Sequence, residues 1–128
     1  MKIERTLIMR ILGYLFLLGG IVRLFADENL FKLFFMDGAW SDHPYFIYIY
    51  RVLGAFVILA GFVIVQVSRD LLKYREIMHM LMWGFLVIGA VMLVTGILTD
   101  LPYYLFVLDA LFVFLLAVLF DRWRKQSN

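Results

Sequence analysis

Residues 45–67 read YFIYIYRVLGAFVILAGFVIVQV, and this stretch decides the class of fold. It holds 23 residues, and its one charged side chain is Arg51. A helix needs about 20 mostly apolar residues, at about 1.5 Å of rise per residue, to cross the hydrocarbon layer of a membrane. The apolar run is continuous rather than alternating, which argues against a strand of a membrane barrel. The stretch therefore predicts a membrane-spanning helix.

Three further stretches have the same character, and together the four predict an all-α protein with four transmembrane helices. Lipid offers no hydrogen-bond partners, so each span must satisfy its own backbone groups, which a helix does. We expect the whole chain, residues 1–128, to form one four-helix transmembrane domain. The expected spans are residues 6–25, 45–67, 77–98 and 101–120.

The composition supports a membrane protein and excludes other classes. Hydrophobic residues make up 65% of the chain and charged residues 17%, against about 45–50% and about 25% in soluble domains. A chain this short has too much surface for its volume to bury so many apolar side chains in water. The high hydrophobicity excludes disorder, and the lack of cysteine excludes disulfides and thiolate metal sites. The net charge of +2 gives no signal for nucleic acid, so the expected partner is the lipid bilayer.

The basic residues predict the orientation of the spans. Nine of the twelve lie at the amino end, between the second and third spans, or in the carboxyl-terminal tail. Four spans put these three places on one side of the membrane, and positive charge marks the cytoplasmic side. We therefore expect both termini to be cytoplasmic. The nine residues are Lys2, Arg5, Arg10, Arg69, Lys73, Arg75, Arg122, Arg124 and Lys125.

The connection between the first two spans is long and contains an apolar segment. Residues 30–36, LFKLFFM, are too apolar to lie in water, and they predict a short interfacial helix on the external membrane surface. A plug folded back over the bundle is the alternative. Asp27 or Asn29 could cap this helix. Residues 99–102, by contrast, form a tight turn, so the third and fourth spans must be antiparallel neighbours.

Two glycine-containing segments recur at an offset of 41 residues. The sequences RILG at 10–13 and LGGIV at 18–22 match RVLG at 51–54 and LAGFV at 59–63. Because the first two spans run in opposite directions, a true repeat would be inverted; chance similarity between glycine-rich helices is the alternative. In either case, small residues let helix backbones approach closely. These residues are Gly13, Gly19, Gly20, Gly54, Ala55, Ala60, Gly61, Gly84, Gly89, Ala90 and Gly96.

Charged residues inside the predicted spans are the candidate functional residues. Arg51 and Asp109 both lie on the order of 10 Å below the external ends of their spans, at about 1.5 Å per residue. A lone charge near the membrane midplane costs at least ~2.5–3.5 kcal/mol, and an opposite charge at the same depth offsets that cost. We predict an Arg51–Asp109 ion pair facing the bundle interior, with Arg23 as a second cation. Two alternatives stay open: an inert pair that fixes helix register, or a proton or ligand site.

No pattern of catalytic residues occurs in the sequence. A Ser-His-Asp set, HExxH, a P-loop and a dinucleotide fingerprint are all missing from it. Residues 78–82, MHMLM, offer soft copper ligands, but one span supplies too few. We expect His79 instead to cap its helix or to form a hydrogen bond near the cytoplasmic surface, towards Gln66. Asp37, Asp42 and His43 could form a small metal site, although solvated loop residues account for them. We predict no enzyme, catalytic residue, metal or cofactor.

The chain resembles the small four-helix DoxX-like bacterial membrane proteins, and most closely their uncharacterised relatives. The resemblance rests on Arg10-Ile-Leu-Gly13, on Arg51-Val-Leu-Gly54 and on the acidic Asp109 in the fourth span, and it covers residues 10–120. It implies a four-helix bundle in the bacterial cytoplasmic (inner) membrane, with Arg10, Arg51 and Asp109 as polar residues of the bundle interior. Characterised members are linked to redox or quinone-associated membrane complexes, a role for which this chain lacks thiols.

These observations predict a non-enzymatic membrane protein that acts as an accessory or scaffolding subunit, or as a small homo-oligomer. Its partners would then be copies of itself or a larger membrane complex. The alternative is a component of a small-molecule or lipid transporter. Such a transporter would have an externally open polar pocket bounded by Arg23, Arg51 and Asp109.

Overall fold

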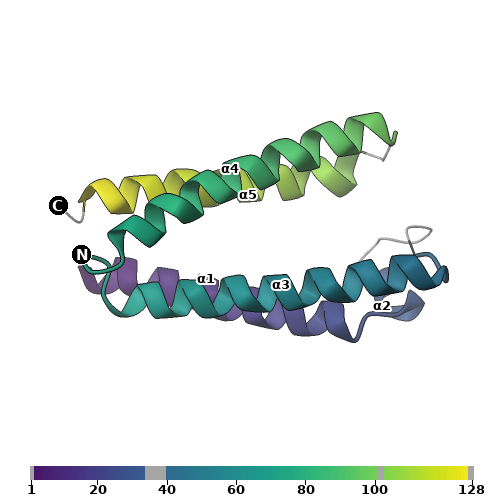
Figure 1. Cartoon of the computed structure of the whole chain (residues 1–128), viewed down its shortest axis with the longest axis horizontal. Coiled ribbons are helices and arrows are strands. Elements are labelled where there is room, and N and C mark those ends of the chain that lie inside the picture. The colour runs from purple at the N-terminus through teal and green to yellow at the C-terminus, as the bar shows by residue number, and fades with distance from the viewer. Residues whose placement is uncertain (1, 34–39, 101–102, 127–128) are drawn as a thin grey trace. The chain divides into compact units, whose positions relative to one another are not determined.

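The computed structural model of the chain describes residues 2–33, 40–100 and 103–126 and has no strand within these ranges (Figure 1). The expected all-α fold is therefore confirmed. Among the residues that the structure describes, three helices are long and apolar enough to cross a membrane, namely those containing residues 4–24, 44–69 and 75–98. The helices are α1 (Lys2–Leu24), α2 (Glu28–Leu33), α3 (Pro44–Arg69), α4 (Arg75–Leu98) and α5 (Tyr103–Gln126).

The four long helices cover most of the residues of the four predicted spans; α1 ends one residue earlier and α5 begins two residues later than predicted. The largest difference is at α5, which continues to Gln126 rather than ending near residue 120. The added turns are stabilised by the Asp121 carboxylate, which pairs with Arg124 and Lys125 one turn further along the helix. Charge pairs at these spacings support a helix that extends beyond its apolar segment.

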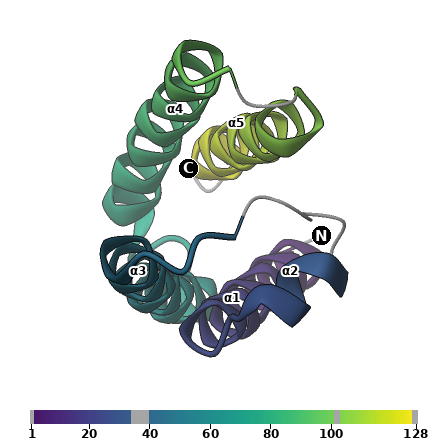
Figure 2. The same cartoon turned by 90° about the vertical axis from the view of Figure 1, so that its right-hand side faces the viewer.

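The chain divides into two compact units, residues 1–69 and 70–128. In the first unit α1 packs against α3, and in the second α4 packs against α5 (Figure 2). Both pairs are antiparallel, which confirms the expectation that the third and fourth spans are antiparallel neighbours. The prediction of a single domain stays a prediction.

Four glycines form the centre of the α1–α3 interface. A Cβ atom placed on Gly20 would lie 2.6 Å from the carbonyl oxygen of Gly54, and one on Gly61 would lie 2.9 Å from that of Gly13. Real Cβ atoms almost never come within 3.0 Å of another heavy atom, so only glycine allows this backbone approach. Without side chains in the way, the helices gain close van der Waals contact along their backbones.

The α4–α5 interface uses glycine in a different way, as a recess for aromatic rings. The Phe114 ring packs on Gly89, where a Cβ atom would lie 2.7 Å from the ring, and the Phe106 ring packs on Gly96. Further along the pair, the Phe85 and Phe120 rings stack with centroids 5.6 Å apart. Large rings thus fill the space that the small residues leave.

The short helix α2 differs from the predicted interfacial helix in its bounds. It begins at Glu28 rather than residue 30, because the Asp27 carboxylate accepts a hydrogen bond from the Leu30 amide at 2.8 Å. This confirms Asp27 as the cap, and the unpaired amides of a first helical turn explain why a carboxylate is favoured there. The prediction for residues 34–36 lies outside the described residues.

An aromatic cluster holds α2 against the first turns of α3. The Phe31 ring is buried and lies 5.1 Å from Trp40 and 5.2 Å from Tyr50, centroid to centroid. Phe46 contacts the same three rings, at 5.4 to 6.4 Å. Edge-to-face contacts of this kind add to the free energy gained by burying the rings. The first connection is therefore packed onto its own unit at α2 and at Trp40.

Candidate functional site

Arg23 lies at the α1–α3 interface, at the end of α1. Its guanidinium donates a hydrogen bond to the Gly19 carbonyl oxygen at 3.1 Å. Its Cβ atom packs on Gly54, 2.9 Å from the position a Cβ atom would take there. Gly54 follows Arg51 by three residues on α3, so the structure brings Arg23 within one helical turn of Arg51.

Arg51 and Asp109 lie in different units of the chain. Arg51 is exposed on α3 in the first unit, and within the described ranges it makes no hydrogen bond or ion pair. Asp109 is exposed on α5 in the second unit. The structure does not fix one unit against the other. The Arg51–Asp109 ion pair therefore stays a prediction.

The loop residues named as a possible metal site have other partners. The Asp42 carboxylate accepts a hydrogen bond from the Trp40 indole at 2.8 Å. The His43 imidazole accepts one from the Tyr45 amide at 3.1 Å, at the start of α3. Asp37 lies outside the described residues. In the described part of the chain, no group of three or more histidine, aspartate or glutamate side chains could hold a metal ion.

His79 has a partner on its own helix. The Trp83 indole nitrogen donates a hydrogen bond to His79 Nε2 at 3.1 Å, four residues along α4. An indole N–H can only donate, so Nε2 accepts and the ring hydrogen is carried on Nδ1. Nδ1 is buried and has no hydrogen-bond partner in the described part of the chain. A hydrogen bond of His79 near the end of the helix is present, and its donor is Trp83, which a spacing of four residues could have predicted. The predicted direction towards Gln66, in the other unit, stays a prediction.

The His79–Trp83 pair is one polar cluster of this unit, and a second one is centred on Arg124, near the carboxyl end of α5. Its Nη2 donates to the Asp121 carboxylate at 2.8 Å, while Lys125 Nζ lies 3.1 Å from the other oxygen of that carboxylate. Hydrogen bonds from Arg124, and secondly from Lys125, hold the pKa of the Asp121 carboxyl below its ordinary value. The Nε atom of Arg124 is buried and lacks a hydrogen-bond partner among the described residues. This triad was not among the predicted sites, although the spacing of its residues is visible in the sequence.

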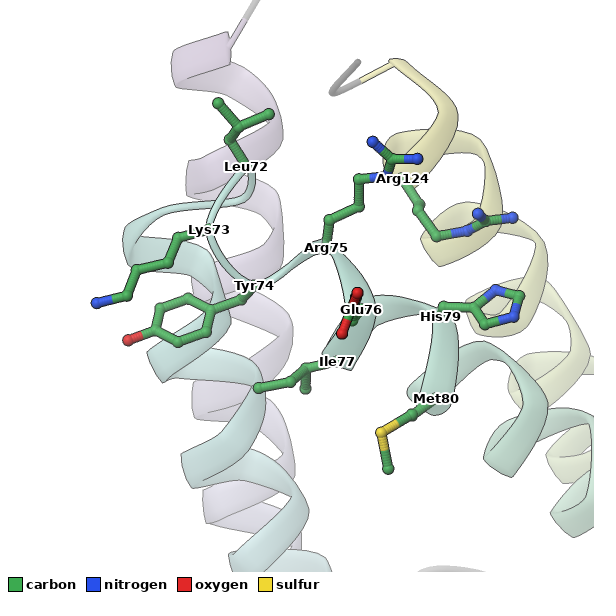
Figure 3. A pocket seen from close by; sticks show the side chains of 9 residues that line it. All are labelled: Leu72, Lys73, Tyr74, Arg75, Glu76, Ile77, His79, Met80 and Arg124. Atoms are coloured by element: carbon green, nitrogen blue, oxygen red, sulfur yellow. The ribbon is translucent and has the colours of Figure 1, made fainter.

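These two clusters border one groove of about 850 Å³ at the start of α4, which we call the basic groove (Figure 3). Arg75 extends from the start of α4 towards Arg124, and His79 points to the same side (Figure 3). Lys73 and Tyr74 point to the opposite side, where the Lys73 ammonium lies 5.4 Å from the centre of the Tyr74 ring. The lining residues are Leu72, Lys73, Tyr74, Arg75, Glu76, Ile77, His79, Met80 and Arg124.

The side chains of the basic groove are suited to an anion. Arginine offers a planar set of N–H donors that matches the oxygens of a carboxylate or phosphate. Histidine and arginine side chains supply hydrogen-bond donors here. The geometry therefore supports binding of a negative group.

Comparisons with known proteins give no further assignment, since no family model, curated protein or solved structure matches this chain. The resemblance to DoxX-like proteins stays a prediction from the residues. The fold and the clusters define a helical protein with apolar helices of membrane-spanning length.

Proposed function

We propose that the chain is a non-enzymatic integral membrane protein in which α1, α3, α4 and α5 cross the bilayer. The observation that carries this proposal is the exposure of large apolar side chains on all four helices. Leu18 of α1 is 59% exposed, Phe56 of α3 63%, Val87 of α4 60% and Leu111 of α5 59%. Exposed apolar side chains spread over every long helix are rare on soluble monomers, and lipid tails would cover them.

The sequence of α5 supports it as the fourth span. Between Phe106 and Phe120 its one charged residue is Asp109, and large apolar side chains occupy most other positions. Together with the even number of spans, the distribution of basic residues favours cytoplasmic termini in a bacterial inner membrane. The proposed topology puts the start of α4 and the end of α5 at the cytoplasmic surface.

The proposed role is that of an accessory or scaffolding subunit, alone as a small homo-oligomer or within a larger membrane complex. Gly84 on α4 supports association, because a Cβ atom placed there would meet nothing within 4 Å. Its neighbours on the helix surface are apolar and exposed, with Met80 at 70% and Val91 at 58%. A small residue on an apolar outer face allows close approach of another helix.

The test of this proposal is extraction of the full chain with a mild nonionic detergent, followed by light scattering and mass spectrometry of the purified particle. We expect the chain to stay in the membrane fraction after alkaline carbonate washing. We further expect a particle larger than one copy, containing either further copies or a defined larger complex. Release by carbonate would contradict membrane integration, and a strictly monomeric particle would contradict the scaffolding role.

A second candidate function is favoured by one observation: Arg51 is exposed and has no hydrogen-bond or ion-pair partner among the described residues. A cation inside a span is a functional candidate by default. In this alternative Arg23, Arg51 and Asp109 bound a polar pocket that opens externally, and the protein is a component of a small-molecule or lipid transporter. Flux across reconstituted vesicles that depends on pH and is lost in Asp109→Asn would support the transporter. Equal flux in both proteins would favour the scaffold.

A further inference from the structure

We propose that the basic groove binds the phosphate group of an anionic ligand, and that this ligand is the headgroup of an anionic phospholipid. The inference rests on the proposed function in one respect, which is that α4 and α5 cross a membrane. It adds a ligand class and a binding site that the scaffolding role does not require.

The arrangement of the two arginines is the first observation. Arg75 begins α4 and Arg124 is near the end of α5, and Figure 3 shows Arg75 reaching towards Arg124. Two guanidinium groups that line one groove repel each other, and Asp121 offsets only part of this repulsion because it also pairs with Lys125. Phosphate is well matched to such a pair, because each guanidinium can donate two parallel hydrogen bonds to its oxygens.

The second observation is a surplus of hydrogen-bond donors. His79 Nδ1 and Arg124 Nε are both buried without a partner among the described residues. The nearby acceptor, Asp121, is already engaged through one oxygen by Arg124 and through the other by Lys125. A buried N–H without an acceptor is costly, and phosphate is an acceptor. A small rotation of the His79 and Arg124 side chains towards the groove would let a bound phosphate accept from them.

One carboxylate within the groove opposes this binding. Glu76 is exposed and lines the groove together with Arg75, the residue before it. Arg75 and Arg124 outnumber this single acidic side chain, so the groove remains positive even without Lys73, which points to the opposite side. Glu76 thus provides a test of opposite sign to the arginine variants, because removing its negative charge should strengthen binding of an anion.

The apolar part of the groove favours a lipid over a free phosphate. Leu72, Ile77 and Met80 line it alongside the arginines, and Leu72 and Met80 are 64% and 70% exposed. Inorganic phosphate makes no apolar contact with such a surface, whereas the glycerol and upper acyl chains of a phospholipid can pack against it. Basic residues immediately cytoplasmic of a membrane helix attract anionic lipids for the same electrostatic reason. The volume of about 850 Å³ lies within the usual size of ligand pockets.

The experiment uses the full chain in a mild nonionic detergent, with phosphatidylglycerol or phosphatidylcholine added and the bound lipid measured by native mass spectrometry. Both lipids offer a phosphate, but the two arginines repel the choline cation of phosphatidylcholine. We therefore expect phosphatidylglycerol to bind about tenfold more tightly than phosphatidylcholine. Arg75→Gln and Arg124→Gln should each abolish this preference. Glu76→Gln should increase it.

Two variants serve as matched controls. Arg122→Gln removes one positive charge from the same end of α5 without touching the groove, and it should leave the preference within about twofold. Asp121→Asn breaks the ion pair of Arg124 but keeps its donors, so it should retain or increase phosphatidylglycerol binding. Circular dichroism and size-exclusion chromatography of every variant establish that it is folded.

Three results would overturn the proposal. The first is equal binding of the two lipids by the unaltered protein. The second is an equal loss of preference in Arg122→Gln and Arg75→Gln, which would indicate general charge attraction. The third is displacement of phosphatidylglycerol by millimolar inorganic phosphate, which would assign the groove to a free phosphate. A protein that resists carbonate extraction yet shows no lipid preference would refute this inference alone and leave the proposed function standing.

Discussion

Gly13 of α1 and Gly61 of α3 pack backbone against backbone, and Gly20 and Gly54 repeat this contact with the roles of the two helices exchanged. In each helix the two glycines are seven residues apart, which is two turns of helices that wind gently around each other. The contacts on the two sides of the interface are therefore equivalent.

The equivalence extends to the larger neighbours and follows the sequence offset of 41 residues. Gly61 contacts Leu17, and the matching contact joins Gly20 to Ile58. Likewise Gly13 contacts Val65, and Gly54 contacts Leu24. In each pair of contacts, the α1 residue of one contact lies 41 positions before the α3 residue of the other. Leu17 thus corresponds to Ile58, and Gly13 corresponds to Gly54. The packing thus has the symmetry expected of an inverted repeat, which chance similarity would not require.

Gly20→Ala should destabilise the protein. Its Cβ atom would lie 2.6 Å from the Gly54 carbonyl oxygen and 2.8 Å from the Ile58 amide nitrogen, and neither backbone atom can move alone. Overpacking of this kind costs about 1–3 kcal/mol. The matched control is Gly19→Ala on the same helix, where a Cβ atom would meet only the flexible end of the Arg23 side chain, at 3.2 Å. Thermal unfolding in detergent should show a lower midpoint for Gly20→Ala only; equal midpoints would contradict the close approach.

Reversal of charge tests the predicted pair of Arg51 and Asp109. Arg51→Asp and Asp109→Arg should each lower stability, because each leaves two like charges at one depth in the membrane. The double variant should recover a coupling free energy of about 0.5–3 kcal/mol, the range for residues in contact. Additive losses in the double-mutant cycle would show that the two residues do not meet.

Acid should weaken the end of α5. The pKa of Asp121 is lowered by Arg124 and Lys125, so its ionised form stabilises the folded state. That stabilisation is present above the ordinary carboxyl pKa of about 4 and is lost as pH falls through the lower folded value. Below about pH 4, the unfolding temperature of the native chain should therefore fall more than that of Asp121→Asn. Parallel curves for the two proteins would contradict the ion-pair triad.

Trp83→Phe should change the tautomer of His79. The indole N–H now donates to Nε2 at 3.1 Å and keeps the ring hydrogen on Nδ1, whereas phenylalanine keeps the ring contact but loses the donor. Nitrogen chemical shifts of the imidazole should show one tautomer in the native protein and a mixture in the variant. We expect a cost of about 0.5–1.5 kcal/mol, the usual net value of one hydrogen bond. Identical spectra would mean that another group sets the tautomer.

The topology can be tested with introduced thiols, because the chain has no cysteine of its own. Ser41→Cys, in the first connection, should react with a membrane-impermeant maleimide added to intact cells. Ser127→Cys, in the carboxyl-terminal tail, should react only after the membrane is permeabilised. Labelling of position 127 in intact cells would refute cytoplasmic termini.

The helical elements could be predicted from the sequence because membrane helices follow local rules. Continuous apolar stretches predicted all four long helices, and Asp27 predicted the cap of α2. The polar clusters could not be found in this way. His79 appeared as a possible copper ligand or cap, and Arg124 as one basic residue among several, since their meaning depends on Trp83 and Asp121 one turn away.

The amino-acid sequence by itself determined the helices, their approximate ends and the small residues at which helices could meet, because hydrophobicity and backbone hydrogen bonding act over neighbouring residues. Only the tertiary structure decided that Gly13 faces Gly61 while Gly89 receives the Phe114 ring, and that Arg75 extends towards Arg124. Those choices depend on the register of one helix against another. Register is set by the fit of side chains that are distant in the sequence, so no local pattern encodes it.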